Sequence, residues 1–175
     1  MTEDNATPCC GSAAPCPEEP SWFAHMLGHC LDYARESHAH GRPIVGIMCE
    51  YTPRELILAA GAVPVCLCGG SAETIPAAEQ HLPANLCPLI KSTYGFSVLK
   101  SNPFLEMAPL IVAETTCDGK KKMYERLGER YPMYVLELPQ KPLRASGLRS
   151  WEEELQRFKA ELETRFSVSI TDERL

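Results

Sequence analysis

The sequence predicts an α/β fold, in which a parallel sheet is flanked by helices in a Rossmann-like arrangement, with an amino-terminal helix and a disordered tail. Two observations predict it. Short apolar runs alternate with segments of helical spacing along residues 43–166, and such alternation is typical of a parallel sheet covered on both faces. The chain also has 175 residues, 45% of them hydrophobic, which is enough for one domain with a sizeable core.

The first 39 residues divide into a tail and a helix. Residues 1–20 mix Pro, Cys, Ala and Ser without a period and are expected to be disordered. Residues 22–39 are expected to form an amphipathic helix capped by Ser21. Its apolar stripe, in which Cys30 is expected to be structural, consists of Trp22, Phe23, Met26, Leu27, Cys30, Leu31 and Ala34. His25 and His29 have the spacing of a metal pair, but without a matching cysteine or carboxylate we expect a solvated or packed face.

Four short apolar runs predict strands at 43–48, 62–67, 109–115 and 133–138. Helices are predicted between and after them, at 53–60, 72–82, 85–99, 119–130 and 151–166, with Thr52, Ser71 and Ser150 as N-caps. Residues 21–166 are therefore expected to form one α/β domain. Residues 167–175 look strand-like and then like the cap of a new helix, which predicts the start of a missing second domain.

Composition excludes several classes of protein. A net charge of -6 argues against a general nucleic-acid binder. Lys91 and the Lys120–Lys122 run are expected to be solvated, the run as a helix start. No apolar stretch suits a membrane span and the first residues do not resemble a signal peptide, so a cytoplasmic location is expected. Thiols stay reduced there. The nine cysteines therefore indicate metal binding or catalysis rather than disulfides.

Three cysteines stand where a site would form. Cys49 and Cys117 follow predicted strands, and Cys87 precedes a proline at a predicted helix start. Because the carboxyl ends of parallel strands meet at one edge, where ligands bind, these thiols are expected to converge. Cluster ligands and buried structural thiols both remain open on spacing alone. Cys66 and Cys68 share a strand face before two glycines, which is a weak zinc signal.

Three segments carry a resemblance to a known family. They are GIMCEYTPRELILAAGA at 46–62, NLCPLIKS at 85–92 and TTCDGKKK at 115–122. With these motifs, residues 43–140 resemble the amino-terminal domain of the family that holds 2-hydroxyacyl-CoA dehydratase subunits, benzoyl-CoA reductase subunits and double-cubane cluster proteins.

The resemblance implies an iron–sulfur cluster between two α/β domains, of the [4Fe-4S] or double-cubane type. Cys87 and Cys117 resemble its ligands, and Cys49 and Cys68 resemble further ligands of the double-cubane branch, which we favour for that reason. The implied activity is low-potential reduction of a small molecule or dehydration of a 2-hydroxyacyl-CoA, with electrons from an ATP-dependent iron–sulfur activator protein. Glu50 and Glu114 are candidate acid/base groups; the alternative for each is a carboxylate in a surface ion pair.

The chain is about half as long as the family implies. A missing carboxy-terminal domain or a second subunit would have to complete the cluster, so a dimer is expected and the isolated chain is expected to be inactive. Two alternatives stay open. The first is a non-catalytic metal or iron–sulfur module that uses Cys9, Cys10 and Cys16. The second is an inactive truncated fragment.

Overall fold

A computed structural model describes residues 21–175 of the chain. The predicted disordered tail and its thiols, Cys9, Cys10 and Cys16, lie outside the described residues. Within them, no helix is both long and apolar enough to cross a membrane.

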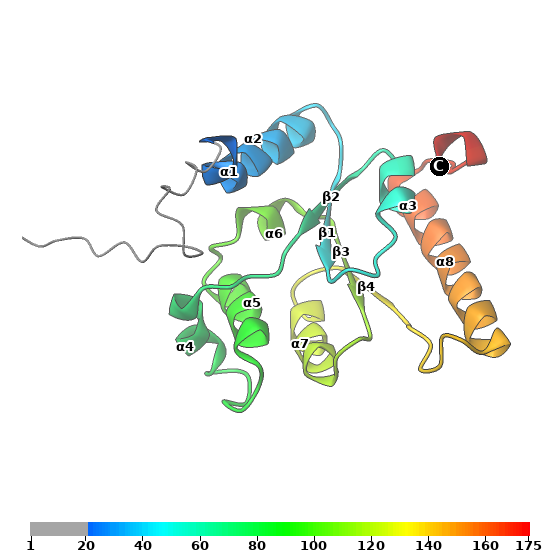
Figure 1. The fold of residues 1–175 in the computed structure, drawn as a ribbon. Helices are drawn as coiled ribbons and strands as arrows, with labels where there is room; N and C mark the ends of the chain where they lie inside the picture. The colour runs from blue at the N-terminus through cyan, green and yellow to red at the C-terminus, as the bar shows by residue number, and fades with distance from the viewer. Residues whose placement is uncertain (1–20) are drawn as a thin grey trace, which may run out of the picture.

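A four-stranded sheet forms the centre of the fold, and all its strands are parallel, which confirms the predicted fold class (Figure 1). The strands are β1 (Ile44–Met48), β2 (Val63–Cys66), β3 (Leu110–Glu114) and β4 (Met133–Leu136), in the order β2-β1-β3-β4. Every residue of the two central strands, β1 and β3, is buried. Their near-continuous apolar runs follow from burial on both faces.

Helices cover both faces of the sheet (Figure 1). One face packs against α3 (Arg54–Ala59) and α8 (Ala145–Phe166), with Phe158 and Leu162 of α8 fully buried. The other face packs against α4 (Ile75–Ala78), α5 (Pro88–Val98) and α7 (Asp118–Gly128). The result is a three-layer α/β/α sandwich, as expected when apolar strands need cover on each side.

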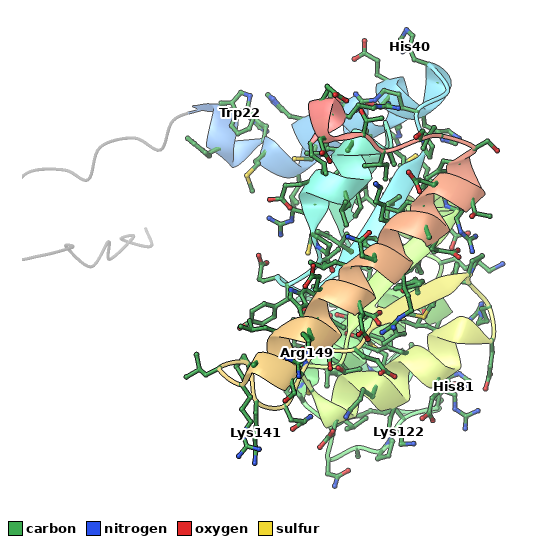
Figure 2. All side chains as sticks on the ribbon, turned by 90° about the vertical axis from the view of Figure 1, so that its right-hand side faces the viewer. Trp22, His40, His81, Lys122, Lys141 and Arg149 are labelled. Carbon is green, nitrogen blue, oxygen red and sulfur yellow. The ribbon has the colours of Figure 1, made fainter. Side chains whose placement is uncertain are left out.

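The amino-terminal helix differs from its prediction. It is split into α1 (Ser21–Ala24) and α2 (Met26–Ala39), which part at His25. Ala34 packs on β1 and β2 beside α6 (Pro103–Met107), a short helix that the sequence reasoning missed. Most of the predicted buried stripe is exposed: Trp22 is 51% and Leu27 76% accessible, and Figure 2 shows Trp22 far from the body of the fold. Cys30 is exposed as well, so the expectation of a structural thiol was wrong.

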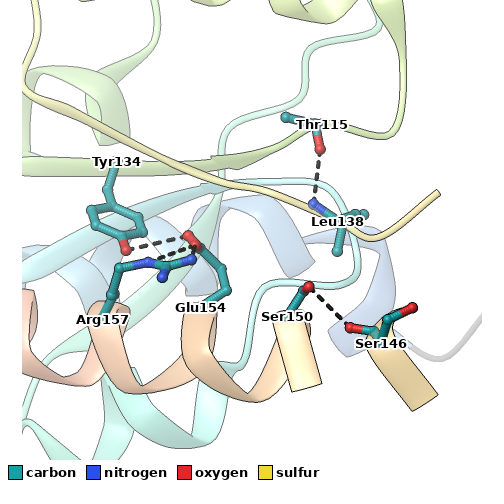
Figure 3. Close-up of polar contacts among 7 residues, drawn as sticks. All are labelled: Thr115, Tyr134, Leu138, Ser146, Ser150, Glu154 and Arg157. Carbon is teal, nitrogen blue, oxygen red and sulfur yellow. Dashed lines mark hydrogen bonds and ion pairs between the residues drawn. The ribbon is translucent and has the colours of Figure 1, made fainter. Parts of the chain in front are cut away.

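Helix starts were the least accurate predictions. Pro53, not Thr52, is the N-cap of α3, and the buried hydroxyl of Thr52 has no partner within residues 21–175. Helix α8 begins at Ala145, five residues before the predicted cap Ser150, whose hydroxyl donates to the Ser146 carbonyl at 3.0 Å (Figure 3). A serine inside a helix can bond its own preceding turn, so a cap-like sequence does not need to start a helix.

Two further segments depart from the predicted pattern. Ser71 does act as a cap, but the expected helix at 72–82 is a 3-10 turn, η2 (Ala72–Thr74), followed by the single turn α4. Residues 167–175 form no strand. Ser167 closes α8 with φ at 53°, Ile170 is buried in the core, and a 3-10 turn, η3 (Asp172–Arg174), follows. That this segment begins a second domain stays a prediction.

Candidate functional site

The carboxyl edge of the sheet gathers thiols around one lysine. Cys49 follows β1, Cys68 lies two residues past β2, and Cys117 precedes α7. Lys120, in the first turn of α7, contacts the Cys49 thiol through its ammonium group. Burial of Lys120 favours its neutral form, yet that contact and the nearby Cys68 and Cys117 outweigh burial and raise its pKa. A stable positive charge therefore sits among three potential thiolates.

Cys49 holds an unusual backbone conformation. Its φ of 95° lies in the left-handed region that favours glycine. A side chain there is strained, and such strain concentrates at functional sites. The turn lets the chain leave β1 while the Cys49 thiol stays at the sheet edge beside Lys120.

The two candidate acids have different surroundings. Glu50 is exposed and pairs with Arg54 at 3.1 Å, which is the surface ion pair given as its alternative. Glu114 ends β3 and is completely buried, and within the described residues neither carboxylate oxygen has a hydrogen-bond partner. Burial raises the pKa of Glu114, although the nearby Lys120 charge offsets part of that effect. Glu114 is therefore biased toward its protonated form beside Cys49.

Cys66 and Cys68 interact with each other at the end of β2. The Cys68 thiol hydrogen-bonds Cys66, which lowers the pKa of Cys66 to about 6 and raises that of Cys68. Cys66 is exposed and Cys68 is half-buried. Cys68 also lies near Lys120 and Cys49, so it faces the same edge as they do.

Cys87 and Cys117 occupy equivalent positions, because each is the N-cap of a helix, α5 and α7 respectively. The two helix starts lie side by side. A Cβ atom placed on Gly119 would be 2.8 Å from the Ile90 side chain and 3.9 Å from the Cys117 sulfur. Free amide groups at helix starts favour thiolates and bound anions, so both positions suit ligands of a negatively charged group. Cys87 is exposed, whereas Cys117 is half-buried.

The thiols share an edge without forming a closed metal site. Across residues 21–175, no set of three or more Cys, His, Asp or Glu side chains is close enough to hold a metal ion. Cys49, Cys68 and Cys117 lie near Lys120, and Cys87 is the N-cap of α5. Thiolate ligands placed at helix starts fit an iron–sulfur cluster. Residues 21–175 do not, however, bring together a complete set of ligands.

A cavity adjoins this edge on the α8 side, and the sequence reasoning missed it. Its volume is about 430 Å³, and it lies past the ends of β3 and β4. The Thr115 hydroxyl accepts a hydrogen bond from the Leu138 amide at 2.9 Å, which holds two of its walls together (Figure 3). Its walls are Tyr51, Thr115, Thr116, Leu138, Pro139, Gln140, Pro142, Gly147, Leu148 and Trp151. A larger cavity of about 520 Å³, near Pro43 and Pro109, is lined by none of the predicted site residues.

The lysines were the other functional residues that sequence reasoning placed wrongly. Both Lys91 and Lys120 were expected to be solvated. Lys120 contacts Cys49, and Lys91 is 7% exposed and paired with Glu79 at 2.6 Å. Lys121 and Lys122 do form surface ion pairs, with Asp118 and Glu125. The signal that separates Lys120 from its neighbours is helical phase, since Lys120, Met123, Tyr124 and Leu127 share the inner face of α7.

Comparisons with known proteins give one consistent family. Residues 49–175 match the family model of the 2-hydroxyglutaryl-CoA dehydratase D-component. The chain is similar to YjiM of Escherichia coli (strain K12), which is named as a dehydratase subunit, with 46% identity over 77% of this chain and 35% of that protein. It is also similar to the lactoyl-CoA dehydratase subunit beta of Anaerotignum propionicum, with 27% identity over 81% of this chain and 36% of that protein.

A third relative is the (R)-phenyllactyl-CoA dehydratase beta subunit of Clostridium sporogenes, with 28% identity over 77% of this chain and 36% of that protein. The chain thus spans about a third of the length of the curated relatives that it matches. The family match covers well over half of the chain and includes Cys49, Cys68, Cys87 and Cys117. The chain therefore belongs to the 2-hydroxyglutaryl-CoA dehydratase D-component family.

Proposed function

We propose that this chain is part of an iron–sulfur dehydratase component that acts on a 2-hydroxyacyl-CoA. The observation that carries the proposal is the placement of Cys49, Cys68 and Cys117 around Lys120 at the carboxyl edge of the sheet. Membership of the family and the names of the two dehydratase beta subunits support the substrate class. In an open parallel sheet this edge is where ligands bind.

Cys87 and Cys117 would hold the cluster, of the [4Fe-4S] or double-cubane type, with Cys49 and Cys68 as further ligands. When bound, such a cluster supplies single electrons of low potential. The chain's own residues then divide the remaining work. Lys120 balances negative charge on the thiolates, and the helix starts of α5 and α7 add backbone amides that do the same. Burial raises the pKa of Glu114, which lies beside Cys49, and so favours its protonated form.

The cavity beside Thr115 and Trp151 would receive the acyl group of the substrate. Its walls are mostly apolar, which suits a short acyl chain, and the Thr116 and Gln140 side chains can bind a hydroxyl or carbonyl oxygen. Thr115 and Thr116 in the cavity wall directly precede Cys117 in the sequence. A bound acyl group would therefore lie next to the cluster ligands. We propose that a carboxy-terminal domain or a second subunit lies opposite this edge. The resulting dimer would be cytoplasmic and would receive electrons from an ATP-dependent iron–sulfur activator protein.

A second candidate function is reduction of a small molecule instead of dehydration. Cys49 and Cys68 favour it, because the double-cubane branch resembles this chain at those two positions, and both thiols lie beside Lys120. The same cluster would serve either reaction, and the substrate that is turned over distinguishes them.

Anaerobic reconstitution with iron and sulfide tests the proposal. We expect the full-length gene product to gain the broad visible absorption of an iron–sulfur cluster, and Cys117→Ser to lose it. Cys30→Ser is the matched control, because Cys30 is an exposed thiol on α2, away from the edge. Equal iron content in the two variants, or no cluster in the unaltered protein, would overturn the proposal.

A further inference from the structure

Helix α5 carries three successive polar residues that are all buried. Lys91 is 7%, Ser92 2% and Thr93 5% exposed. Successive side chains on a helix point about 100° apart, so these three reach different neighbours. A buried polar group is costly unless it finds a partner, and each of the three residues contributes a side-chain or backbone group that has one.

Lys91 anchors residues 79–87, the segment that leads to Cys87, through hydrogen bonds. Its ammonium donates to the Glu79 carboxylate at 2.6 Å and to the Ala84 carbonyl at 2.8 Å. Its backbone amide donates to the Cys87 carbonyl at 3.1 Å. One residue thereby holds residues 79–87 at the start, the middle and the end of the segment.

Ser92 and Thr93 form hydrogen bonds with residues 69–74, the segment that follows Cys68. The Thr74 hydroxyl lies 3.0 Å from both the carbonyl and the hydroxyl of Ser92. The Gly69 amide donates to the Thr93 hydroxyl at 3.0 Å. The helix also approaches this segment closely, because a Cβ atom on Gly95 would lie 2.0 Å from the Thr74 carbonyl oxygen. Gly69 directly follows Cys68, so the Thr93 bond acts on the neighbouring peptide.

We propose that Lys91, Ser92 and Thr93 are positioning residues, which fix the two loops carrying Cys87 and Cys68 relative to each other from a single turn of α5. The part that concerns a cluster rests on the proposed function. Stability alone does not account for the run, since apolar residues of similar volume are often as stabilising as a buried ion pair. What the polar run adds is a defined placement for two loops that come from different parts of the sequence.

Thr93→Val tests the Cys68 loop, because valine keeps the shape of threonine and removes the acceptor for the Gly69 amide. Hydrogen exchange of that amide, followed by NMR in the metal-free chain, should quicken about tenfold, as expected for a lost hydrogen bond. Thr93→Ser keeps the hydroxyl and should restore slow exchange. Unchanged exchange in Thr93→Val would overturn the role of Thr93.

Lys91→Met tests the Cys87 loop, and Lys122→Met is its matched control. Lys122 also pairs with a glutamate, Glu125 at 2.8 Å, but both side chains are exposed. Exchange across residues 79–87 should quicken about tenfold in Lys91→Met and stay unchanged in Lys122→Met. Lys91→Arg keeps the charge and the donors, and should recover part of the protection. Equal exchange in the two Met variants would overturn the role of Lys91.

The link to the cluster has its own readout, which is the loss of iron to a chelator from the reconstituted full-length protein. Substituting a residue that orients metal ligands typically lowers metal affinity about tenfold or more. The Lys91→Met variant should therefore release iron about tenfold faster than the Lys122→Met variant. Equal release would show that Lys91 orders the loop without acting on the ligands, against the proposal. If the unaltered protein takes up no iron, the proposed function fails, while the exchange results still decide the positioning role.

Discussion

Cys49 combines a thiol at the sheet edge with a backbone that L-amino acids avoid. Its φ of 95° implies stored strain, which glycine would relieve at the price of the side chain. Cys49→Gly should therefore be more stable than Cys49→Ala by ~1 kcal/mol. Urea unfolding of the two variants measures the difference, and an alanine variant as stable as the glycine variant would contradict the strained conformation.

Glu114 gives the chain a pH-dependent stability. Its pKa is raised above the ordinary 4.5 by burial, so the folded chain holds this proton more tightly than the unfolded chain. The stabilisation of the fold by protonated Glu114 is thus fully present below pH 4.5. It declines as pH rises through the pKa that Glu114 has in the folded chain. Glu114→Gln removes the titration.

We expect the free energy of unfolding of the Glu114→Gln variant, measured in urea, to increase relative to that of the unaltered chain as pH rises above 4.5. Removal of the Tyr124 hydroxyl is the control. That hydroxyl is also buried near Glu114, but burial raises its pKa, so it stays protonated over the pH range in which Glu114 titrates. A constant difference between Glu114→Gln and the unaltered chain at all pH values would contradict a raised pKa.

At the scale of elements, α8 is held to the sheet by a polar contact as well as by its apolar stripe. Glu154 is 4% exposed, and it accepts hydrogen bonds from Arg157 at 2.7 Å and from the Tyr134 hydroxyl of β4 at 3.3 Å (Figure 3). Arg157 is itself largely exposed, so its loss would leave a buried carboxylate short of its strongest partner.

Arg157→Ala should accordingly cost ~1–2 kcal/mol, between the values for surface and buried ion pairs. Arg126→Ala is the matched comparison, because Arg126 pairs with Glu129 at the same i,i+3 spacing with both side chains exposed. Its cost should stay below ~0.5 kcal/mol. Thermal unfolding distinguishes the two, and equal costs would show that Glu154 does not need its arginine.

At the scale of the whole molecule, α1 and the start of α2 contribute little to the folded core. Trp22 is 51% and Leu27 76% accessible. The double variant Trp22→Ser/Leu27→Ser should therefore change the free energy of unfolding by less than ~0.5 kcal/mol, as exposed substitutions typically do. Phe158→Ala, in the core between α8 and the sheet, is the contrasting case and should cost ~3–5 kcal/mol.

The sequence pattern was sufficient to predict the sheet but not the details of its helices. All four strands lie within their predicted ranges, because apolar runs buried on both faces leave a strong signal. The cap at Ser150 was wrong since α8 continues five residues further toward the amino terminus, where Gly147 is buried against the Lys141 carbonyl. Contacts of that kind depend on the tertiary fold and leave no local pattern.

The candidate site was predictable to a similar extent. Strand ends predicted that Cys49, Cys87 and Cys117 converge, and the resemblance added Cys68. The structure has Cys49, Cys68 and Cys117 near Lys120 and Cys87 at the start of α5. That these thiols bind a cluster stays a prediction. The lysines were misjudged because an isolated lysine is normally solvated. Burial of Lys91 and Lys120 comes from partners 12 and 71 residues away, Glu79 and Cys49, and no short window of sequence contains such a pair.

The distance along the chain between Lys120 and Cys49 also constrains the order of folding. Their contact spans 71 residues, and closing a loop of that length costs chain entropy before the contact can form. The edge can form only after β1 has paired with β3 and α7 has docked behind them. The thiols are thus scattered while the polypeptide emerges from the ribosome, and they share one edge only on the folded domain.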